Sequence, residues 1–426
     1  MPTRRTFILT LTILLVSSLA VGLLSSRRSF VGVAGTATPG AVPSATVLPA
    51  TAAPGAQAAS SGVLPIEAFS PGFLGVYRKV MEIEDEIVEY SSKYGVDLAL
   101  ARAVCMYESG GNANLSSSAG AQGYFQVMGP TFRALRVPTN IEAGIKYLGQ
   151  QVSRFGREDY ALAAYNGGPT RVARGGAMPL ESLQYVLGVG HYRSVLMVHE
   201  ASVRAHAGTL RLETVREGED WWGLSRRLGV PLVQLRLHNP FLASRTLTRG
   251  KLIAFPSDAR PDLLTTGGDE GLRYETRLGD NYFNVAFTLG ADLDLLRTTN
   301  GLWRLQSLLP GTVLAIPLDT TAAFTEHRVG AREDLAQIAA TLKVDPWSLI
   351  RDNALWDEQV REGMVLRVRP APPPKPAVQT HRVRSGENLT SIARRYATTV
   401  RAIQAANSLG RRTLIRIGQR LDIPTK

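Results

Sequence analysis

The stretch YESGGNANLSSSAGAQGYFQVM, residues 107–128, places a single carboxylate between an apolar helical segment and a polar loop bounded by glycines. Glu108 lies four residues after Val104, so it shares the inward-facing side of that helix. The helix dipole also disfavours a carboxylate at a helix C-terminus, which argues against an ordinary solvated side chain. The helix ends at Gly110 and Gly111. An acid at this position, facing a polar loop, can form a sugar-cleaving site.

Helical periodicity continues on both sides of this stretch and predicts an all-α domain over residues 71–205. Asp97 is the expected N-cap of the helix that carries Glu108. The expected helices cover residues 77–94, 98–108, 140–155, 160–165 and 181–198.

Composition sets the broad class of protein. The 426 residues are enough for about two to five domains. A net charge of +12 fits either a solvated basic surface or attraction to a polyanion such as a cell-wall polymer or anionic lipid. Neither zinc-finger spacing nor a long basic run is present, so nucleic acid is not an expected partner. Cys105 is the only cysteine and is expected to be a small buried side chain; no metal or other cofactor is predicted.

The first residues carry a targeting signal. Arg4 and Arg5 precede an uncharged apolar run at residues 6–24, about long enough to span a bilayer as a helix. Residues 1–30 are therefore either a cleaved signal peptide or a retained membrane anchor, and in both cases the chain is exported to the cell envelope. Residues 31–70 are rich in Ala, Pro and Thr and are expected to form a flexible linker.

A repeat of about 45 residues fills the C-terminal half. Its clearest copy begins VRSGENLTSIARRY at residues 383–396, and another begins VREGEDWWGLSRRL at residues 215–228. Each copy predicts a strand, two short helices and a closing strand, so the fold class is a multidomain α+β protein. The modules are expected at residues 211–257, 272–318, 325–370 and 380–426, with a stiff Pro-rich linker at 371–379. Each copy has an asparagine after its second helix, at Asn239, Asn300, Asn353 and Asn407.

The repeats resemble the LysM module, most closely in the last copy. LysM modules bind glycans that contain N-acetylglucosamine, such as peptidoglycan, and the resemblance implies that the loop after the first strand contacts the sugar. The alternative for each glycine is that it serves only the tight turn. The third copy has Arg332 in place of this glycine and is expected to be a degenerate spacer. The candidate glycan-binding residues are Gly218, Glu219, Asp220, Gly279, Asp280, Asn281, Gly386, Glu387 and Asn388.

The helical domain resembles the catalytic domain of the soluble lytic transglycosylase family, which has a lysozyme-like fold. The matching pieces are Glu108-Ser109, residues 119–128, Asn140-Ile141 with Gly144, residues 163–168 and residues 181–186. The resemblance implies that Glu108 is the catalytic acid, oriented by Tyr185 and supported by Ser109. It also implies that Gln126, Tyr165 and Asn166 line the glycan cleft. Together with LysM copies at the C-terminus, the arrangement resembles the membrane-bound murein transglycosylases of the D type.

Two positions depart from the family pattern. Tyr124-Phe125 replaces the usual Leu-Met pair and is expected to alter the floor of a sugar subsite. Leu183 replaces an Arg that anchors the last helix in the family.

A single acid also suits the reaction that the resemblance implies. A desolvated glutamate has the raised pKa that protonation of a glycosidic oxygen requires. Glycosidases normally use a second carboxylate, but Gln126, Tyr165, Asn166 and Tyr185 are neutral. In the family, one glutamate donates a proton and then removes one from the C6 hydroxyl, which leaves a 1,6-anhydromuramoyl end. Two alternatives stay open, namely a goose-type lysozyme-like hydrolase of the same MurNAc-β-1,4-GlcNAc bond and a non-catalytic peptidoglycan-binding protein.

Overall fold

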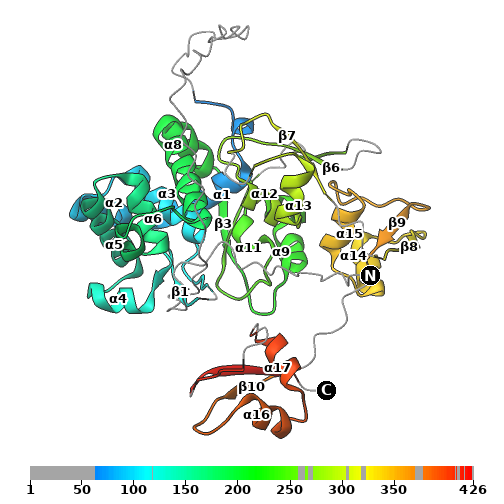
Figure 1. The fold of residues 1–426 in the computed structure, drawn as a ribbon. Coiled ribbons are helices and arrows are strands. Elements are labelled where there is room, and N and C mark those ends of the chain that lie inside the picture. The colour runs from blue at the N-terminus through cyan, green and yellow to red at the C-terminus, as the bar shows by residue number, and fades with distance from the viewer. Residues whose placement is uncertain are drawn as a thin grey trace, which may run out of the picture.

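A computed structural model of the chain shows a helical domain followed by small α+β modules (Figure 1). The structure describes residues 63–117, 119–257, 264–266, 272–303, 307–317, 323–369, 378–407, 409, 413–416 and 418–424. The expected signal peptide or anchor and most of the two expected linkers lie outside these residues. Within the described ranges, no helix has the length and apolar character needed to cross a membrane.

Helices make up the first domain, and α3 lies at its centre. The elements are η1 Ile66–Ala68, α1 Pro71–Val80, η2 Met81–Ile83, α2 Glu84–Tyr94, α3 Leu98–Ser109, β1 Ala121–Gln122, β2 Val127–Met128, α4 Gly129–Leu135, α5 Asn140–Phe155, α6 Glu158–Gly167, α7 Pro169–Ala173 and α8 Leu180–Gly208. Every residue of α3 from Leu100 to Ser109 is buried, because helices pack around the whole of this segment. A helix with this surrounding can bury a carboxylate on the same face as its apolar residues.

Most of the expected helices are confirmed. Asp97 caps α3, since its Oδ1 accepts a hydrogen bond from the Leu100 backbone N–H at 2.9 Å. The prediction of one helix over residues 77–94 was wrong, because the 3-10 turn η2 separates α1 from α2. Val88, one of the apolar residues in that helical pattern, is 44% exposed. The helical pattern missed α4 and α7, which are short and begin with Gly-Pro or Pro.

Four units follow with the predicted order of strand, helix, helix and strand, and we call them modules 1 to 4. Module 1 contains β3 Arg211–Thr214, α9 Trp221–Leu228, α10 Leu232–Leu237, α11 Pro240–Ala243 and β4 Leu252–Phe255. Module 2 contains β6 Leu272–Glu275, α12 Tyr282–Leu289, α13 Leu293–Thr299 and β7 Val313–Ile316, with β5 Leu264–Thr266 added beside β6. Module 3 contains β8 Thr325–Arg328, α14 Leu335–Leu342, α15 Pro346–Asp352 and β9 Val365–Val368. Module 4 contains β10 Val378–Arg382, α16 Leu389–Arg395, α17 Val400–Ala406 and β11 Arg420–Pro424. In each module the first strand pairs antiparallel with the last.

The repeated asparagine holds each module closed. In module 4, Asn407 Nδ2 donates to the carbonyls of Ile403 and Asp422, at 2.8 and 2.7 Å, and Oδ1 accepts from the Asp422 N–H at 2.8 Å. The same three bonds recur at Asn239, Asn300 and Asn353. One side chain thus ties the second helix to the closing strand, which explains its recurrence along the repeat.

The loop after the first strand keeps its shape even where the glycine is lost. Gly218, Gly279 and Gly386 have φ of 70°, 88° and 82°, and Arg332 takes the same left-handed conformation with φ of 65°. This conformation is unfavourable for a residue with a side chain. Module 3 therefore folds like the others despite the substitution that suggested a degenerate copy.

Modules 1, 2 and 3 are not structurally independent. One apolar core joins Leu237 of module 1 to Leu289 of module 2 and Trp347 of module 3, although module 1 also has a core of its own around Leu224 and Ile253. The guanidinium of buried Arg236 stacks on the Trp347 ring at 4.1 Å. Module 4 has a core made of its own residues and lies apart from the rest in Figure 1. The first three modules are thus packed against one another, whereas the core of module 4 contains none of their residues.

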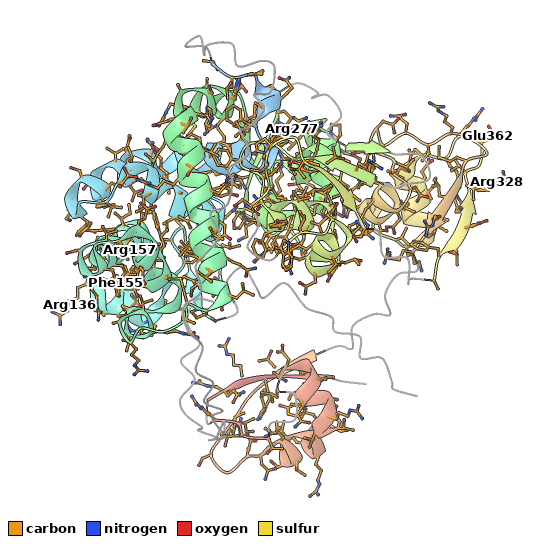
Figure 2. All side chains as sticks on the ribbon, turned by 45° about the horizontal axis from the view of Figure 1, so that its top comes forward. Arg136, Phe155, Arg157, Arg277, Arg328 and Glu362 are labelled. Atoms are coloured by element: carbon orange, nitrogen blue, oxygen red, sulfur yellow. The ribbon has the colours of Figure 1, made fainter. Side chains whose placement is uncertain are left out.

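Many charged side chains lie on the outer surface. Arg136, Arg157, Arg328 and Glu362 all project outward in Figure 2 and are exposed. The excess of basic residues behind the net charge of +12 is therefore available, at least in part, to an anionic polymer.

Candidate active site

Glu108 sits in the last turn of α3 and is only 5% exposed. Burial raises its pKa to about 8, and a hydrogen bond from Tyr185 Oη to Glu108 Oε1, at 2.8 Å, partly opposes that rise. A carboxyl group with this pKa is largely protonated at neutral pH. It can therefore donate a proton, which is the first requirement of a general acid.

Three tyrosines surround the acid. The Tyr107 ring meets the Tyr185 ring edge-on with centroids 5.5 Å apart, and the Tyr165 ring lies parallel to that of Tyr185 at 6.5 Å. Tyr165 Oη donates to the Phe125 carbonyl at 2.8 Å, which joins α6 to the glycine-bounded loop. Burial raises the pKa of both Tyr165 and Tyr185, so both hydroxyls keep their protons and act as donors. These contacts bring the predicted Tyr165 and Tyr185 together around Glu108.

The loop between Gly120 and Met128 holds Gln126 in a strained, left-handed conformation with φ of 46°. Its Nε2 donates to the carbonyls of Leu115 and Gly123, at 2.8 and 2.7 Å. Its buried Oε1 has no hydrogen-bond partner among the described atoms. An unpaired buried amide oxygen is uncommon, so this oxygen is a candidate acceptor for a ligand.

Asn140 fixes the same loop from α5. Its Oδ1 accepts from the Phe125 N–H at 3.1 Å and its Nδ2 donates to the Gln122 carbonyl at 2.8 Å. The absence of a side chain at Gly144 lets Phe125 pack against α5, because a Cβ there would come within 2.2 Å of Phe125. The Asn140-Ile141 and Gly144 motif is thereby explained as a support for the loop.

The other two predicted residues, Asn166 and Ser109, bond to the protein itself. Asn166 Oδ1 accepts from Ser182 Oγ at 3.3 Å, which links the end of α6 to α8. Ser109 is fully buried, and its hydroxyl donates to the Cys105 carbonyl at 3.2 Å. Ser109 thus supports the end of the helix that carries the acid. Asn112, which the sequence did not single out, also holds this end through Nδ2 bonds to the Ser109 and Gly110 carbonyls at 2.6 and 3.1 Å.

The two departures from the family pattern have different consequences. Phe125 is completely buried, so it does not form the surface of a subsite as expected but sets the position of the loop from inside. Tyr124 is half-buried and packs against the same core. Leu183 is half-buried on α8.

Two further acids lie in the neighbouring motifs, and neither resembles Glu108. Glu142 pairs with Lys93 at 2.7 Å and accepts from Tyr94 Oη at 2.7 Å, and the Lys93 hydrogen bond lowers its pKa. Glu181 is exposed in the first turn of α8. Across the described ranges, no group of three His, Cys, Asp or Glu side chains could hold a metal ion. Of the three acids in these motifs, Glu108 is thus the one that is buried among neutral partners.

The acidic residues of the module loops serve the loops themselves. In the three candidate loops the acid accepts from a backbone N–H three residues earlier, and the next residue caps the following helix. The acid bonds are Glu219 to Arg216 N at 2.9 Å, Asp280 to Arg277 N at 2.8 Å and Glu387 to Arg384 N at 2.7 Å. The caps are Asp220 to Gly223 N at 2.7 Å, Asn281 to Asn284 N at 2.9 Å and Asn388 to Ser391 N at 2.9 Å. These side chains shape the loops, whose exposed backbone remains at Gly218 and Gly386.

The loop of module 2 is packed against the helical domain. Asp280 is 3% exposed, and Asn281 Nδ2 donates to Tyr192 Oη on α8 at 3.1 Å. Gly279 faces the Phe73 ring so closely that a Cβ would lie 2.3 Å from it. The expectation that Gly279, Asp280 and Asn281 contact glycan is therefore corrected, since the structure commits all three to an interface within the chain.

Comparison with known families agrees with this geometry. The model of the family described as Transglycosylase SLT domain matches residues 85–179, which include Glu108, Gln126 and Asn166. The LysM domain model matches residues 327–369 and 381–424. The chain carries an SLT transglycosylase domain and LysM domains.

The LysM matches fall on modules 3 and 4. The prediction of LysM modules is confirmed for these two, and module 3, expected to be degenerate, is one of them. Modules 1 and 2 have the same order of strands and helices, but the family model finds two LysM domains in the chain and not four.

Two individual proteins resemble parts of the chain. A protein of Enterobacteria phage PRD1 named transglycosylase is 39% identical over 93 residues, which are 20% of this chain and 35% of the phage protein. A solved structure of an inactive mutant of the lytic transglycosylase Slt from Pseudomonas aeruginosa has 25% sequence identity and a TM-score of 0.24, and the match covers 27% of this chain and 24% of that one. The chain thus spans about a third of the phage protein and about a quarter of the Slt chain.

Proposed function

We propose that this protein is a lytic transglycosylase that cleaves the MurNAc-β-1,4-GlcNAc bond of peptidoglycan and leaves 1,6-anhydromuramoyl ends. The observation that carries the proposal is the burial of Glu108 with a pKa of about 8 and a single hydrogen bond from Tyr185. The acids in the neighbouring motifs are paired or exposed, so neither Glu142 nor Glu181 is poised to activate water.

The mechanism follows from one acid acting twice. The Glu108 carboxyl donates its proton to the glycosidic oxygen, the C1–O bond breaks, and the GlcNAc hydroxyl leaves. The resulting carboxylate keeps the hydrogen bond from Tyr185 Oη and then removes the proton of the C6 hydroxyl of MurNAc. The C6 oxygen bonds to C1, which closes the anhydro ring without water and returns Glu108 to its protonated form.

The neutral residues around the acid would position the sugar. Gln126 Oε1 is free to accept from a sugar hydroxyl or acetamido N–H, and Asn166 lies at the end of α6 beside Ser182. Each is held by the loop or helix contacts described above, so the cleft is organised before substrate binds.

Modules 3 and 4 are the proposed anchors on the wall. Both match the LysM family, and module 4 has its own core, so it can bind glycan while the SLT domain acts on a nearby strand. Linked modules raise residence on a polymer because each rebinding step is intramolecular. We further propose that the chain is exported to the cell envelope through residues 1–30, as signal peptide or anchor.

The test is the mass of the muropeptides released from purified sacculi. The wild-type chain should yield anhydro ends, and Glu108→Gln should lower turnover by at least about 100-fold while sacculus binding is retained. The matched control is Glu181→Gln, which alters an exposed acid of the same domain and should leave turnover unchanged. Products dominated by reducing ends would indicate a hydrolase instead. If neither the wild type nor Glu108→Gln releases muropeptides while both bind sacculi, the chain is a wall-binding protein without catalysis.

A further inference from the structure

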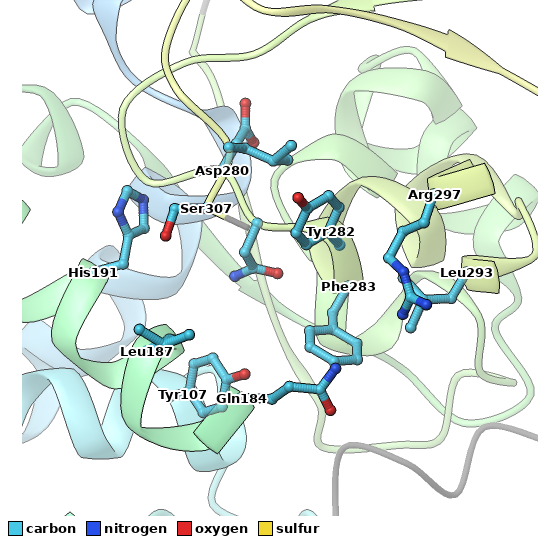
Figure 3. A pocket seen from close by; sticks show the side chains of 13 residues that line it. Tyr107, Gln184, Leu187, His191, Asp280, Tyr282, Phe283, Leu293, Arg297 and Ser307 are labelled. Atoms are coloured by element: carbon cyan, nitrogen blue, oxygen red, sulfur yellow. The ribbon is translucent and has the colours of Figure 1, made fainter. Parts of the chain in front are cut away.

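A pocket lies between α8 of the SLT domain and helices α12 and α13 of module 2 (Figure 3). Its cavity volume is about 50 Å³, and its walls are mostly apolar. Leu187 comes from the α8 side, whereas Phe283 and Leu293 come from module 2. The pocket exists only because module 2 is docked, and Asn284 Nδ2 helps to fix that docking by donating to Tyr192 Oη at 2.6 Å.

Three polar groups on these walls lack hydrogen-bond partners among the described atoms. They are Tyr282 Oη, Arg297 Nε and His191 Nε2. Tyr282 and Arg297 are only 8% and 7% exposed, so neither compensates by reaching open solvent. Buried polar groups are nearly always paired, because an unpaired one is unfavourable. Three such groups around one opening indicate a site that a polar ligand completes.

The charges around the pocket favour an anionic ligand with small apolar parts. The guanidinium of Arg297 can bind a carboxylate, and its ion-pair partner among the described residues is the exposed Asp294, 3.1 Å from Nη2. The carboxylate of Asp280 also lines the pocket, but Tyr274 Oη and the Arg277 N–H already bond to it, both at 2.8 Å. Burial lowers the pKa of His191, so its ring adds no positive charge at neutral pH. A carboxylate beside methyl groups matches this combination of donors and apolar walls.

The pocket is close to the catalytic acid. One of its walls is Tyr107, whose ring meets that of Tyr185, and Tyr185 in turn bonds to Glu108. In peptidoglycan the peptide is attached to the MurNAc sugar whose bond would be cleaved, and this peptide carries free carboxylates and alanine methyl groups. We propose that the pocket receives one carboxylate-bearing residue of the peptide of peptidoglycan through Arg297 and Tyr282, so that module 2 contributes to substrate selection. This assignment rests on the proposed function.

The first experiment compares two substrates. Glycan strands that carry peptides and strands stripped of peptides by an amidase are given to the full-length chain, and kcat/KM for release of anhydro ends is measured. The wild type should prefer the peptide-bearing strands by at least about 10-fold. Tyr282→Phe and Arg297→Met should each remove that preference and leave the rate on stripped strands unchanged. Arg361→Met, an exposed substitution in module 3, is the control and should keep the preference.

Calorimetric titration of a soluble L-alanyl-γ-D-glutamyl peptide into the full-length chain gives a second reading that does not depend on turnover. Binding should be measurable for the wild type and lost in both variants. Tyr282→Phe removes a hydroxyl that has no partner among the described atoms, so its unfolding temperature should not fall. Failure of the peptide to bind, or equal losses on both strand types, would overturn the proposal. Absence of anhydro products with peptide binding intact would overturn the proposed function instead.

Discussion

The ring of Phe241, in module 1, lies directly over Gly110, the residue at which the helix carrying Glu108 ends. A Cβ added to Gly110 would come within 2.4 Å of that ring. Nearby, Lys251 Nζ of the same module donates to the Asn114 carbonyl in the loop that follows Glu108, at 2.5 Å. Module 1 thus supports the loop that follows Glu108, a role quite different from that of a mobile anchor.

We expect Gly110→Ala to destabilise the chain by about 2–4 kcal/mol. The left-handed backbone, with φ of 59°, accounts for about 1–2 kcal/mol, and the clash with Phe241 for most of the rest. Gly95→Ala is the matched control, because Gly95 has φ of 64° but open space around it. Denaturant unfolding measures both. Gly110→Ala should destabilise the chain less in a Phe241→Ala background than in the wild type. If the two effects are strictly additive, the two residues are not coupled.

The pH dependence of catalysis should follow the protonation of Glu108. Its pKa of about 8 means that the acid is lost as pH rises through about 8, so kcat/KM should fall on the alkaline side. The hydrogen bond from Tyr185 lowers that pKa, so Tyr185→Phe should move the alkaline limb to higher pH and reduce the maximum rate.

Tyr160→Phe, which alters a tyrosine that is 40% exposed, should leave both the limb and the rate in place. A limb that stays fixed in Tyr185→Phe would show that another group controls the profile.

Changes in module 4 should affect binding to the wall, whereas changes in module 2 should affect the stability of the chain. Removal of residues 370–426 takes away a module with its own core, so binding to sacculi should drop sharply while turnover of short soluble strands is unchanged. Asn281→Ala should leave binding to sacculi unchanged but lower the unfolding temperature, because it removes the bond to Tyr192 and the cap of α12. Co-sedimentation with sacculi and thermal unfolding give the two readings. Loss of sedimentation in Asn281→Ala would restore module 2 as a glycan anchor.

Local signals predicted the parts of the site that depend on local structure. The cap at Asp97 and the phase of Glu108 behind Val104 gave the buried acid, and the helical periodicity over residues 140–155 gave the helix that supports its loop. These features are set within a few residues or by a single helix face, so a periodic pattern can carry them.

Docking of the modules was missed because it depends on contacts between distant segments. Gly279-Asp280-Asn281 reads like Gly386-Glu387-Asn388, yet only the first is buried against α8. A signal was present in the next helix. The α12 sequence YFNVAFTL is apolar on nearly all sides, whereas α16, LTSIARR, has a charged face. A helix that is apolar all round indicates burial on both sides, which a free module does not need.

Lys79 lies close to the loop that follows Glu108. Replacing it with an apolar residue should stabilise the chain. It is 1% exposed, burial lowers its pKa to about 7, and its Nζ bonds to Asn112 Oδ1 at 3.4 Å. Its pKa is lower in the folded chain than the ordinary value of 10.5, so the folded state loses stability as pH falls from 10.5 to about 7 and stays level below that. Lys79→Met should therefore raise the free energy of unfolding by a few kcal/mol at pH 6, with little gain at pH 10.5. Denaturant unfolding at both pH values tests this, and an equal gain at both would assign the effect to packing rather than to the buried charge.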